Sequence, residues 1–139
     1  MTRRETPFAF LDDLVFVRGQ ISGPAGTRRL ALVLDTGATI TTITPEIAAQ
    51  LGYSARDGKR RTRVRTAVGD EHGYMIEVAR FSMLGVAARA FPVHVFDLGH
   101  DDIDGLLGMN FLSLLNYEVR SAEHRIFVEL IERGALSIM

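Results

Sequence analysis

One aspartate in this sequence directly follows an apolar strand. Burying a carboxylate at such a place costs free energy unless hydrogen bonds or an opposite charge stabilise it. Asp35 comes directly after Leu30-Ala31-Leu32-Val33-Leu34, a run without alternation that predicts a central strand covered on both faces. A carboxylate there needs hydrogen bonds. Gly37 allows a tight turn that points N–H groups back at the carboxylate, and the Thr36 hydroxyl can hold the loop. Asp35 is thus a candidate for acid–base chemistry, although an aspartate that caps a strand end explains this tripeptide alone at least as well.

A second glycine turn, far along the chain, repeats the pattern of the first. Leu106-Leu107-Gly108 is again an aliphatic run that meets a glycine, and residues 109–115 follow with the apolar spacing of a short buried helix. After the first turn, Thr44-Pro45-Glu46 places an N-cap hydroxyl before a proline at the first helical position, which predicts a helix that ends near Gly52. The two halves of the chain therefore echo each other weakly.

The other expected elements are strands. Residues 14–19 and 28–34 flank a cluster of turn-forming residues and predict a hairpin. Residues 60–68 and 74–81 alternate about Gly69-Asp70-Glu71-His72-Gly73, which predicts a long hairpin with its tip at these five residues. Further strands are expected at residues 40–43, 86–96, 117–119 and 126–130. The sum is an all-β fold with two short helices, in a single domain over residues 1–139.

Together these motifs resemble the retropepsins, the retroviral-type, single-domain branch of the aspartic proteases. The likeness keeps the same order along nearly the whole chain: the strand that enters Asp35-Thr36-Gly37-Ala38-Thr39, a helix over residues 45–51, a glycine-bearing hairpin in the place of the flap, and the turn at residues 106–108. Leu-Leu-Gly-Met followed by Phe-Leu is especially similar to bacterial retropepsin-like proteins. The resemblance implies a closed acid-protease barrel with one lobe per chain, in which residues 60–81 form the flap.

The resemblance also implies an aspartic endopeptidase whose active site is completed by a second copy of the chain. Pepsin-like enzymes carry two Asp-Thr-Gly motifs in one chain, whereas retropepsins place one in each of two subunits, so a symmetric homodimer is expected here. The two copies of Asp35 would share one proton. One would activate a water against the scissile carbonyl of an extended peptide, while the other would stabilise the developing oxyanion. No metal or organic cofactor is required.

Other residues receive roles by the same resemblance. Thr36, Gly37 and Ala38 would support the catalytic loop, and the turn formed by Leu106, Leu107 and Gly108 would pack behind it. The residues expected to contact substrate are Thr39, Val68, Gly69 and Asp70. Viral members commonly carry an acidic residue where this chain has Thr39 and an arginine where it has Met109, and the joint loss of both charges indicates a different packing of that contact. The C-terminal hairpin, about residues 117–130, is a candidate for the dimer interface.

Composition argues against several other functions. Sixteen Lys and Arg residues nearly balance seventeen Asp and Glu residues, so no overall charge attracts the chain to nucleic acid or an anionic membrane. A basic stripe at Lys59, Arg61, Arg63 and Arg65 is interpreted as an exposed strand face, because a hairpin that turns around Glu71 would place Arg65 opposite Glu77. The absence of cysteine excludes thiol chemistry, and the four histidines lack zinc-binding spacing. Neither nucleic acid nor a metal is expected as a partner.

The sequence leaves the compartment and two rival functions open. No apolar run approaches the roughly 18 residues of a spanning helix, so a soluble and cytoplasmic chain is favoured unless it is a fragment of an anchored protein. The first rival function is a protease-shaped dimerisation or peptide-binding module that does not cleave. The second, a closed β-barrel that binds a small molecule, leaves both glycine motifs unexplained. An intact Asp-Thr-Gly favours catalysis over the non-cleaving module.

Overall fold

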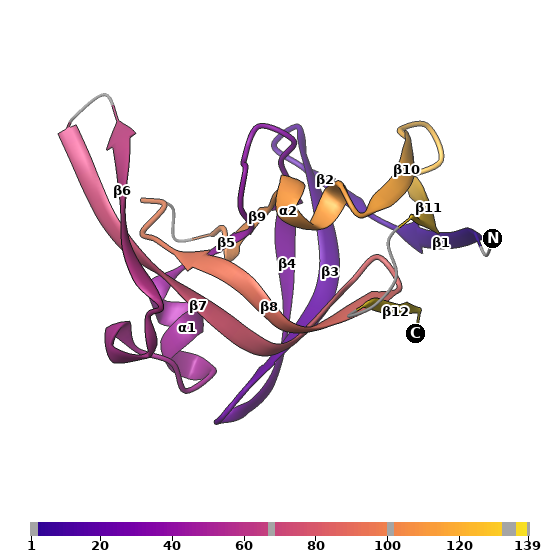
Figure 1. Cartoon of the computed structure of the whole chain (residues 1–139). Helices are drawn as coiled ribbons and strands as arrows, with labels where there is room; N and C mark the ends of the chain where they lie inside the picture. Colours follow the sequence, from indigo (N-terminus) through magenta and orange to yellow (C-terminus); the bar gives the residue numbers. More distant parts are fainter. Residues whose placement is uncertain (1–2, 67–68, 100–101, 132–135, 139) are drawn as a thin grey trace.

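The computed structural model describes residues 3–66, 69–99, 102–131 and 136–138, and of residues 64–66, 69–71 and 136–138 it describes the backbone alone. Strands make up most of these residues and form two sheets (Figure 1). The mostly β fold predicted from the sequence is confirmed. Within the ranges given above, no helix has the length and apolar character needed to span a membrane.

The larger sheet curls round on itself. Its strands follow in the order β12 (Leu136–Ile138), β8 (Val86–Val95), β5 (Thr42–Ile43), β9 (Gly105–Leu107), β4 (Gly26–Leu34), β3 (Leu14–Gly23), β7 (Gly69–Met83) and β6 (Arg60–Thr66), with β2 (Ala9–Leu11) beside β3. An additional antiparallel pairing joins β7 to β8, two strands that this order places far apart. The strands between them therefore wrap into a barrel-like layer, as predicted.

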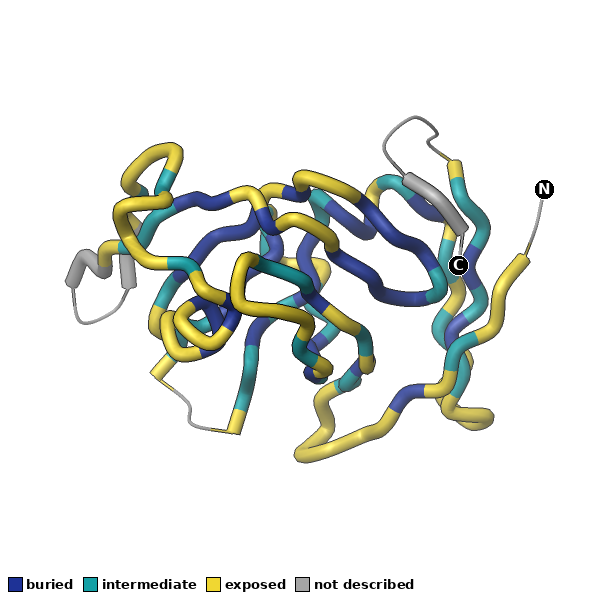
Figure 2. Tube along the Cα trace, turned by 90° about the horizontal axis from the view of Figure 1, so that it is seen from below, coloured by how far each residue is buried: buried dark blue, intermediate teal, exposed yellow. Residues whose placement is uncertain are grey.

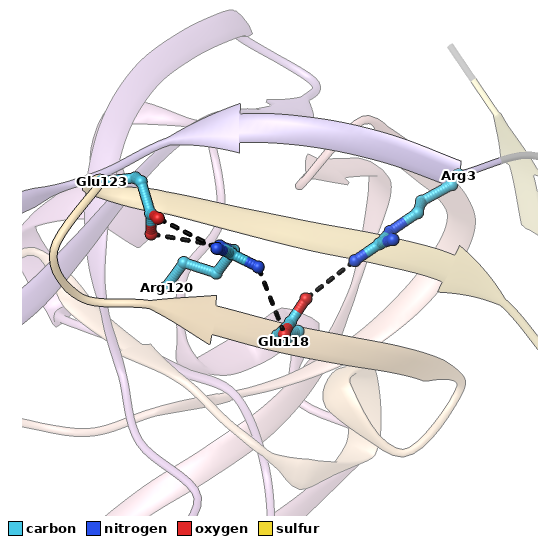
Figure 3. A network of polar contacts seen from close by, with 4 residues as sticks. All are labelled: Arg3, Glu118, Arg120 and Glu123. Carbon is cyan, nitrogen blue, oxygen red and sulfur yellow. Dashed lines mark hydrogen bonds and ion pairs between the residues drawn. The ribbon is translucent and has the colours of Figure 1, made fainter.

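The smaller sheet joins both ends of the chain. Its strands are β1 (Arg3–Pro7), β11 (Arg125–Leu130) and β10 (Leu115–Arg120), in that order. Arg3 reaches Glu118 at 2.7 Å, and Arg120 contacts both Glu118 at 3.8 Å and Glu123 at 2.9 Å (Figure 3). The hydrogen bond from Arg120 lowers the pKa of Glu123. All four side chains are about half exposed, so this network contributes little to stability.

Besides the strands, the described residues include two short α-helices and one 3-10 turn: α1 (Pro45–Gln50), η1 (Ala55–Asp57) and α2 (Met109–Leu112). The Thr44 hydroxyl accepts the N–H of Ile47 at 3.3 Å, so α1 begins as its N-cap and proline predict. Helix α2 is shorter than predicted, because strand β10 begins at Leu115.

The core lies between the barrel strands and the helices, and Figure 2 shows buried segments concentrated in the central strands. Three buried phenylalanines meet at its centre. The ring centroid of Phe81 lies 4.7 Å from that of Phe91 and 5.1 Å from that of Phe111. Since these rings belong to β7, β8 and α2, their contact fixes the helix that follows the second glycine turn against the sheet.

The predicted position of the hairpin tip is wrong. Strands β6 and β7 pair from Arg60 with Met75 to Thr66 with Gly69, so the segment from Gly69 to Gly73 is part of a strand. Arg65 consequently lies opposite Asp70, while Glu77 lies opposite Pro92 on β8. The predicted pairing of Arg65 with Glu77 is therefore wrong as well.

Close packing, and not a turn, explains why glycine occupies position 73. A Cβ atom there would lie 2.4 Å from the carbonyl oxygen of Val95 and 2.8 Å from Nε2 of His94. Any side chain would push the hairpin away from β8. The local sequence indicates a turn at Gly73 because it does not show which strand will lie against this residue.

Candidate active site

Asp35 stands at the point where strand β4 ends. Its carboxylate Oδ1 accepts the N–H of Gly37 at 2.9 Å, and its carbonyl accepts the N–H of Ala38 at 3.1 Å. Its own N–H donates to the carbonyl of Leu107 at 3.0 Å. The loop therefore turns as the Asp-Thr-Gly pattern predicts, with the glycine N–H directed back at the carboxylate.

That hydrogen bond alone does not mark a functional site. Asp97 accepts the N–H of Gly99 at the same distance of 2.9 Å, in an ordinary Asx turn on a different loop. What distinguishes Asp35 is the second glycine turn that lies against its loop. Strand β9 runs parallel to β4, with Val33 beside Leu106. The two motifs that echo each other in the sequence are thus neighbours in the fold.

The second turn holds the whole length of the first loop. The N–H of Met109 donates to the carbonyl of Ala38 at 2.8 Å, and the N–H of Asn110 donates to that of Thr39 at 3.0 Å. A Cβ atom on Gly108 would lie 2.7 Å from the carbonyl carbon of Ile40 and 2.8 Å from the carbonyl oxygen of Ala38. Glycine at this position is what allows the turn to lie so close behind the loop.

A threonine and an asparagine that the sequence analysis missed connect the two turns. The buried Thr41 hydroxyl donates to Asn110 Oδ1 at 2.8 Å and accepts the N–H of Gly108 at 3.1 Å. Asn110 Oδ1 also accepts the N–H of Thr41 at 2.8 Å, and its amide donates to the carbonyl of Pro92 at 2.9 Å. An asparagine in the first turn of a short apolar helix was the available signal, because such a side chain needs buried partners.

The candidate site is more open than the sequence suggested. Leu30 and Leu32 are buried, but Ala31 and Leu34 are only half-buried, so β4 is less completely covered than predicted. Asp35 itself is half-buried, and Thr36, Gly37 and Thr39 are exposed. The loop of a single chain therefore presents its carboxylate at a surface.

An apolar cavity opens beside Asp35. Its volume is about 360 Å³, and it is lined, apart from the carboxylate, by aliphatic side chains. These are Leu14, Val33, Leu34, Leu98, Ile103 and Leu106. The Asp35 carboxylate could therefore act on a polar group of a bound molecule while the cavity holds an apolar side chain next to that group.

The residues predicted to contact substrate belong to separate segments of the fold. Thr39 lies in the Asp35 loop, whereas Gly69 and Asp70 lie at the far end of the β6–β7 hairpin. That hairpin projects to one side of the molecule, away from the smaller sheet (Figure 1). Val68 lies outside the described residues, as does the side chain of Asp70. In the part of the chain described, no group of three or more His, Asp or Glu side chains could hold a metal ion.

A buried histidine lies under the base of the same hairpin. His94 on β8 contacts the Thr62 hydroxyl through Nε2, and its ring stacks on Phe96 with centroids 5.5 Å apart. Burial lowers the pKa of His94 below its ordinary value of 6.5, and the positive charge of Arg60 lowers it further. The folded chain therefore prefers the neutral imidazole.

Acidification should consequently weaken the fold through His94. Below about pH 6.5 the unfolded chain binds a proton that the folded chain resists, so the free energy of unfolding falls until the pH passes the lowered pKa of the folded state. Urea unfolding between about pH 7.5 and pH 5 should show this decline in wild type. The decline should shrink in His94→Gln and persist in His72→Gln, which changes an exposed histidine of the same hairpin. An identical decline in all three proteins would show that another group causes it.

Comparison with known proteins agrees with this geometry. The fold matches the crystal structure of a retropepsin-like aspartic protease from Rickettsia conorii, with a TM-score of 0.67 and 19% sequence identity over 91% of this chain and 98% of that one. The present chain therefore has a retropepsin-like fold. The profile of the aspartyl protease family matches residues 17–111, a span that contains both glycine turns, so the chain belongs to this family. No curated protein matches the sequence.

Proposed function

We propose that the protein is an aspartic endopeptidase in which two chains each contribute one Asp35. The observation that carries this proposal is the loop itself, whose half-buried carboxylate is oriented by the N–H of Gly37 and held from behind by the turn at residues 106–108. Membership of the aspartyl protease family and the retropepsin-like fold support it. Thr36, Gly37 and Ala38 support the loop, and Leu106, Leu107 and Gly108 support it from behind.

Two carboxylates placed against each other across a twofold axis can divide the work of hydrolysis. Because they cannot both ionise cheaply, the pair holds one proton between them. The charged Asp35 takes a proton from a water as that water attacks the scissile carbonyl. The neutral Asp35 of the other chain donates its proton toward the oxygen on which negative charge develops. Neither step calls for a metal or an organic cofactor.

The exposure of the loop and its surroundings supports a symmetric homodimer. An exposed carboxylate loop cannot exclude water by itself, but an isologous contact would cover it with its own copy. Large apolar side chains are exposed at Phe10, Leu11 and Leu14, which lie together in the β2–β3 hairpin. Leu14 also lines the cavity beside Asp35, so a partner that packs on this region would complete the cavity wall.

The substrate that fits this arrangement is an extended peptide with an apolar residue beside the scissile bond. Its main chain would pair with the β6–β7 hairpin, in the role of a flap, and with the loop at Thr39. Val68, Gly69 and Asp70 at the end of the hairpin would contact the substrate there. The aliphatic cavity beside Asp35 would accept the apolar side chain.

The dimer is tested by dilution. If each active site needs two chains, cleavage per chain should fall as the protein is diluted below the dimer dissociation constant, approaching a tenfold loss for each tenfold dilution. Sedimentation velocity over the same concentrations should show dimer giving way to monomer. Monomer at every concentration, with cleavage per chain unchanged, would contradict a shared site.

A further inference from the structure

Four arginines lie on one outward face of the large sheet. Each comes from a different strand, and each is exposed. They are Arg29 on β4, Arg18 on β3, Arg80 on β7 and Arg89 on β8. We call this surface the arginine face.

The strand register puts these side chains on the same side. Gln20 on β3 lies opposite Arg29, and Ser22, two residues further along β3, lies opposite Arg80. Arg80 in turn lies opposite Arg89. Residues that pair directly across a sheet, and residues two apart on one strand, point to the same face. Arg18 lies two residues before Gln20 on β3, so its side chain points to the same face. Three strand spacings make the face roughly 14 Å wide.

The face carries positive charge that the fold does not neutralise. Arg80 and Arg89 are a directly opposed pair of like charges, an arrangement that destabilises a sheet. Among the residues described, neither these two guanidinium groups nor those of Arg18 and Arg29 make an ion pair or a hydrogen bond. Some arginines elsewhere in the described residues are paired, as Arg125 is with Glu5 at 3.3 Å. An anionic partner would offset the repulsion between these positive charges, which destabilises the chain when it is alone.

A cavity of about 590 Å³ occupies one half of this face. Arg18 and Arg29 line it together with polar groups from Gln20, Thr6 and Ser82. Its remaining wall is apolar and comes from Leu30, Ala31, Met83 and Leu84. The cavity thus offers two guanidinium groups, side chains that can hydrogen-bond a main chain, and an apolar surface, on a part of β4 that precedes Asp35 by six residues.

We infer that the arginine face binds an acidic, extended segment of a partner protein. Guanidinium groups pair with carboxylates through two parallel hydrogen bonds, and about five extended residues span the width of the face. The cavity is lined by no aromatic side chain, so a nucleobase would have no ring to stack on there. Of the large exposed apolar residues, Leu11 lines a neighbouring cavity that also includes Arg18, but none lines this one, so a membrane surface would find little to bury within it. The binding requires no cleavage and stands independently of the proposed protease activity.

Fluorescence anisotropy with a labelled peptide of about twelve residues, glutamate at every second position, tests this inference on the full chain. Wild type should bind it, and added salt should weaken the binding. Arg18→Ala/Arg29→Ala should bind at least about tenfold more weakly, because two charge-assisted contacts are lost. Arg18→Lys/Arg29→Lys keeps the charge but not the planar fork, so its affinity should lie between the two. Mass spectrometry of the peptide after each titration confirms that it is intact.

The matched control removes the same charge elsewhere. Arg56→Ala/Lys59→Ala changes two exposed basic residues in and just after η1, neither of which lines the cavity, and should bind the peptide as wild type does. Binding unchanged in both Arg18/Arg29 variants, equal binding of a peptide with glutamine in place of glutamate, or equal weakening in the control would overturn the inference. Tighter binding of a single-stranded oligonucleotide or of anionic vesicles, dependent on the same arginines, would overturn the proposed occupant. Loss of the dimer in Arg18→Ala/Arg29→Ala would also overturn the proposed occupant, because it would show that this face binds a second copy of the chain.

Discussion

Asp35→Asn is expected to lower peptide cleavage at least about thousandfold while the chain stays folded and dimeric. In a homodimer one substitution removes both carboxylates, so the site has neither a base for the water nor an acid for the oxyanion. The fold should persist because the asparagine carbonyl can still accept the N–H of Gly37, which the wild-type carboxylate accepts at 2.9 Å. The loss should therefore appear in the rate and not in the unfolding midpoint.

Asp97→Asn is the matched control for this experiment. Asp97 accepts the N–H of Gly99 at the same distance as Asp35 accepts that of Gly37, but it lacks the second glycine turn behind it. Wild type and both variants would be incubated with a peptide library from acidic to neutral pH, with and without a peptide isostere that carries a hydroxyl in place of the scissile carbonyl. Cleavage should survive in Asp97→Asn and be blocked by the isostere. Equal cleavage by wild type and Asp35→Asn would show that Asp35 is not the catalytic carboxylate. A stable dimer that cleaves nothing would favour a peptide-binding module.

Local patterns predicted the parts of the fold that local contacts determine. The β3–β4 hairpin follows from turn-forming residues between two aliphatic runs, and α1 follows from its cap and proline at Thr44 and Pro45. Strand β1 gave no such signal. Arg3–Pro7 is polar and does not alternate, and it becomes a strand because it pairs with β11 at the opposite end of the sequence. The same limit explains the error at Gly73, whose role depends on β8.

The candidate site divides in the same way. Asp35 and the turn at residues 106–108 carry recognisable patterns, and the fold brings them together through the parallel pairing of β4 with β9. Thr41 carries none, and Asn110 offers only the signal of a polar residue in a short apolar helix, because neither residue shows in the sequence that the other will lie within hydrogen-bond distance. The apolar cavity was also beyond prediction, since its wall combines residues from segments far apart in the sequence.

Gly108→Ala should both destabilise the chain and abolish cleavage, although it adds a single methyl group far along the sequence from Asp35. The new Cβ would lie 2.7 Å from the carbonyl carbon of Ile40 and 2.8 Å from the amide nitrogen of Thr41. Both are backbone atoms, so no side chain can rotate away and the loop itself must move. The backbone of Gly108 has φ −103°, which any residue adopts, so the whole effect is steric. A loss of about 3 kcal/mol in the free energy of unfolding is expected.

Gly99→Ala separates this steric effect from the general cost of replacing glycine. Nothing lies within 4 Å of a Cβ at Gly99, but its φ of +75° is unfavourable for alanine, so the expected loss in unfolding free energy is only about 1 kcal/mol. Both variants would be compared by urea unfolding and by cleavage at denaturant concentrations where each remains folded. If Gly108→Ala were as mild as Gly99→Ala and still cleaved, the second turn would not hold the Asp35 loop. If it folds but does not cleave, the position of Asp35 depends on a backbone contact with a turn about seventy residues away, which explains why the tripeptide alone is too weak to define the site.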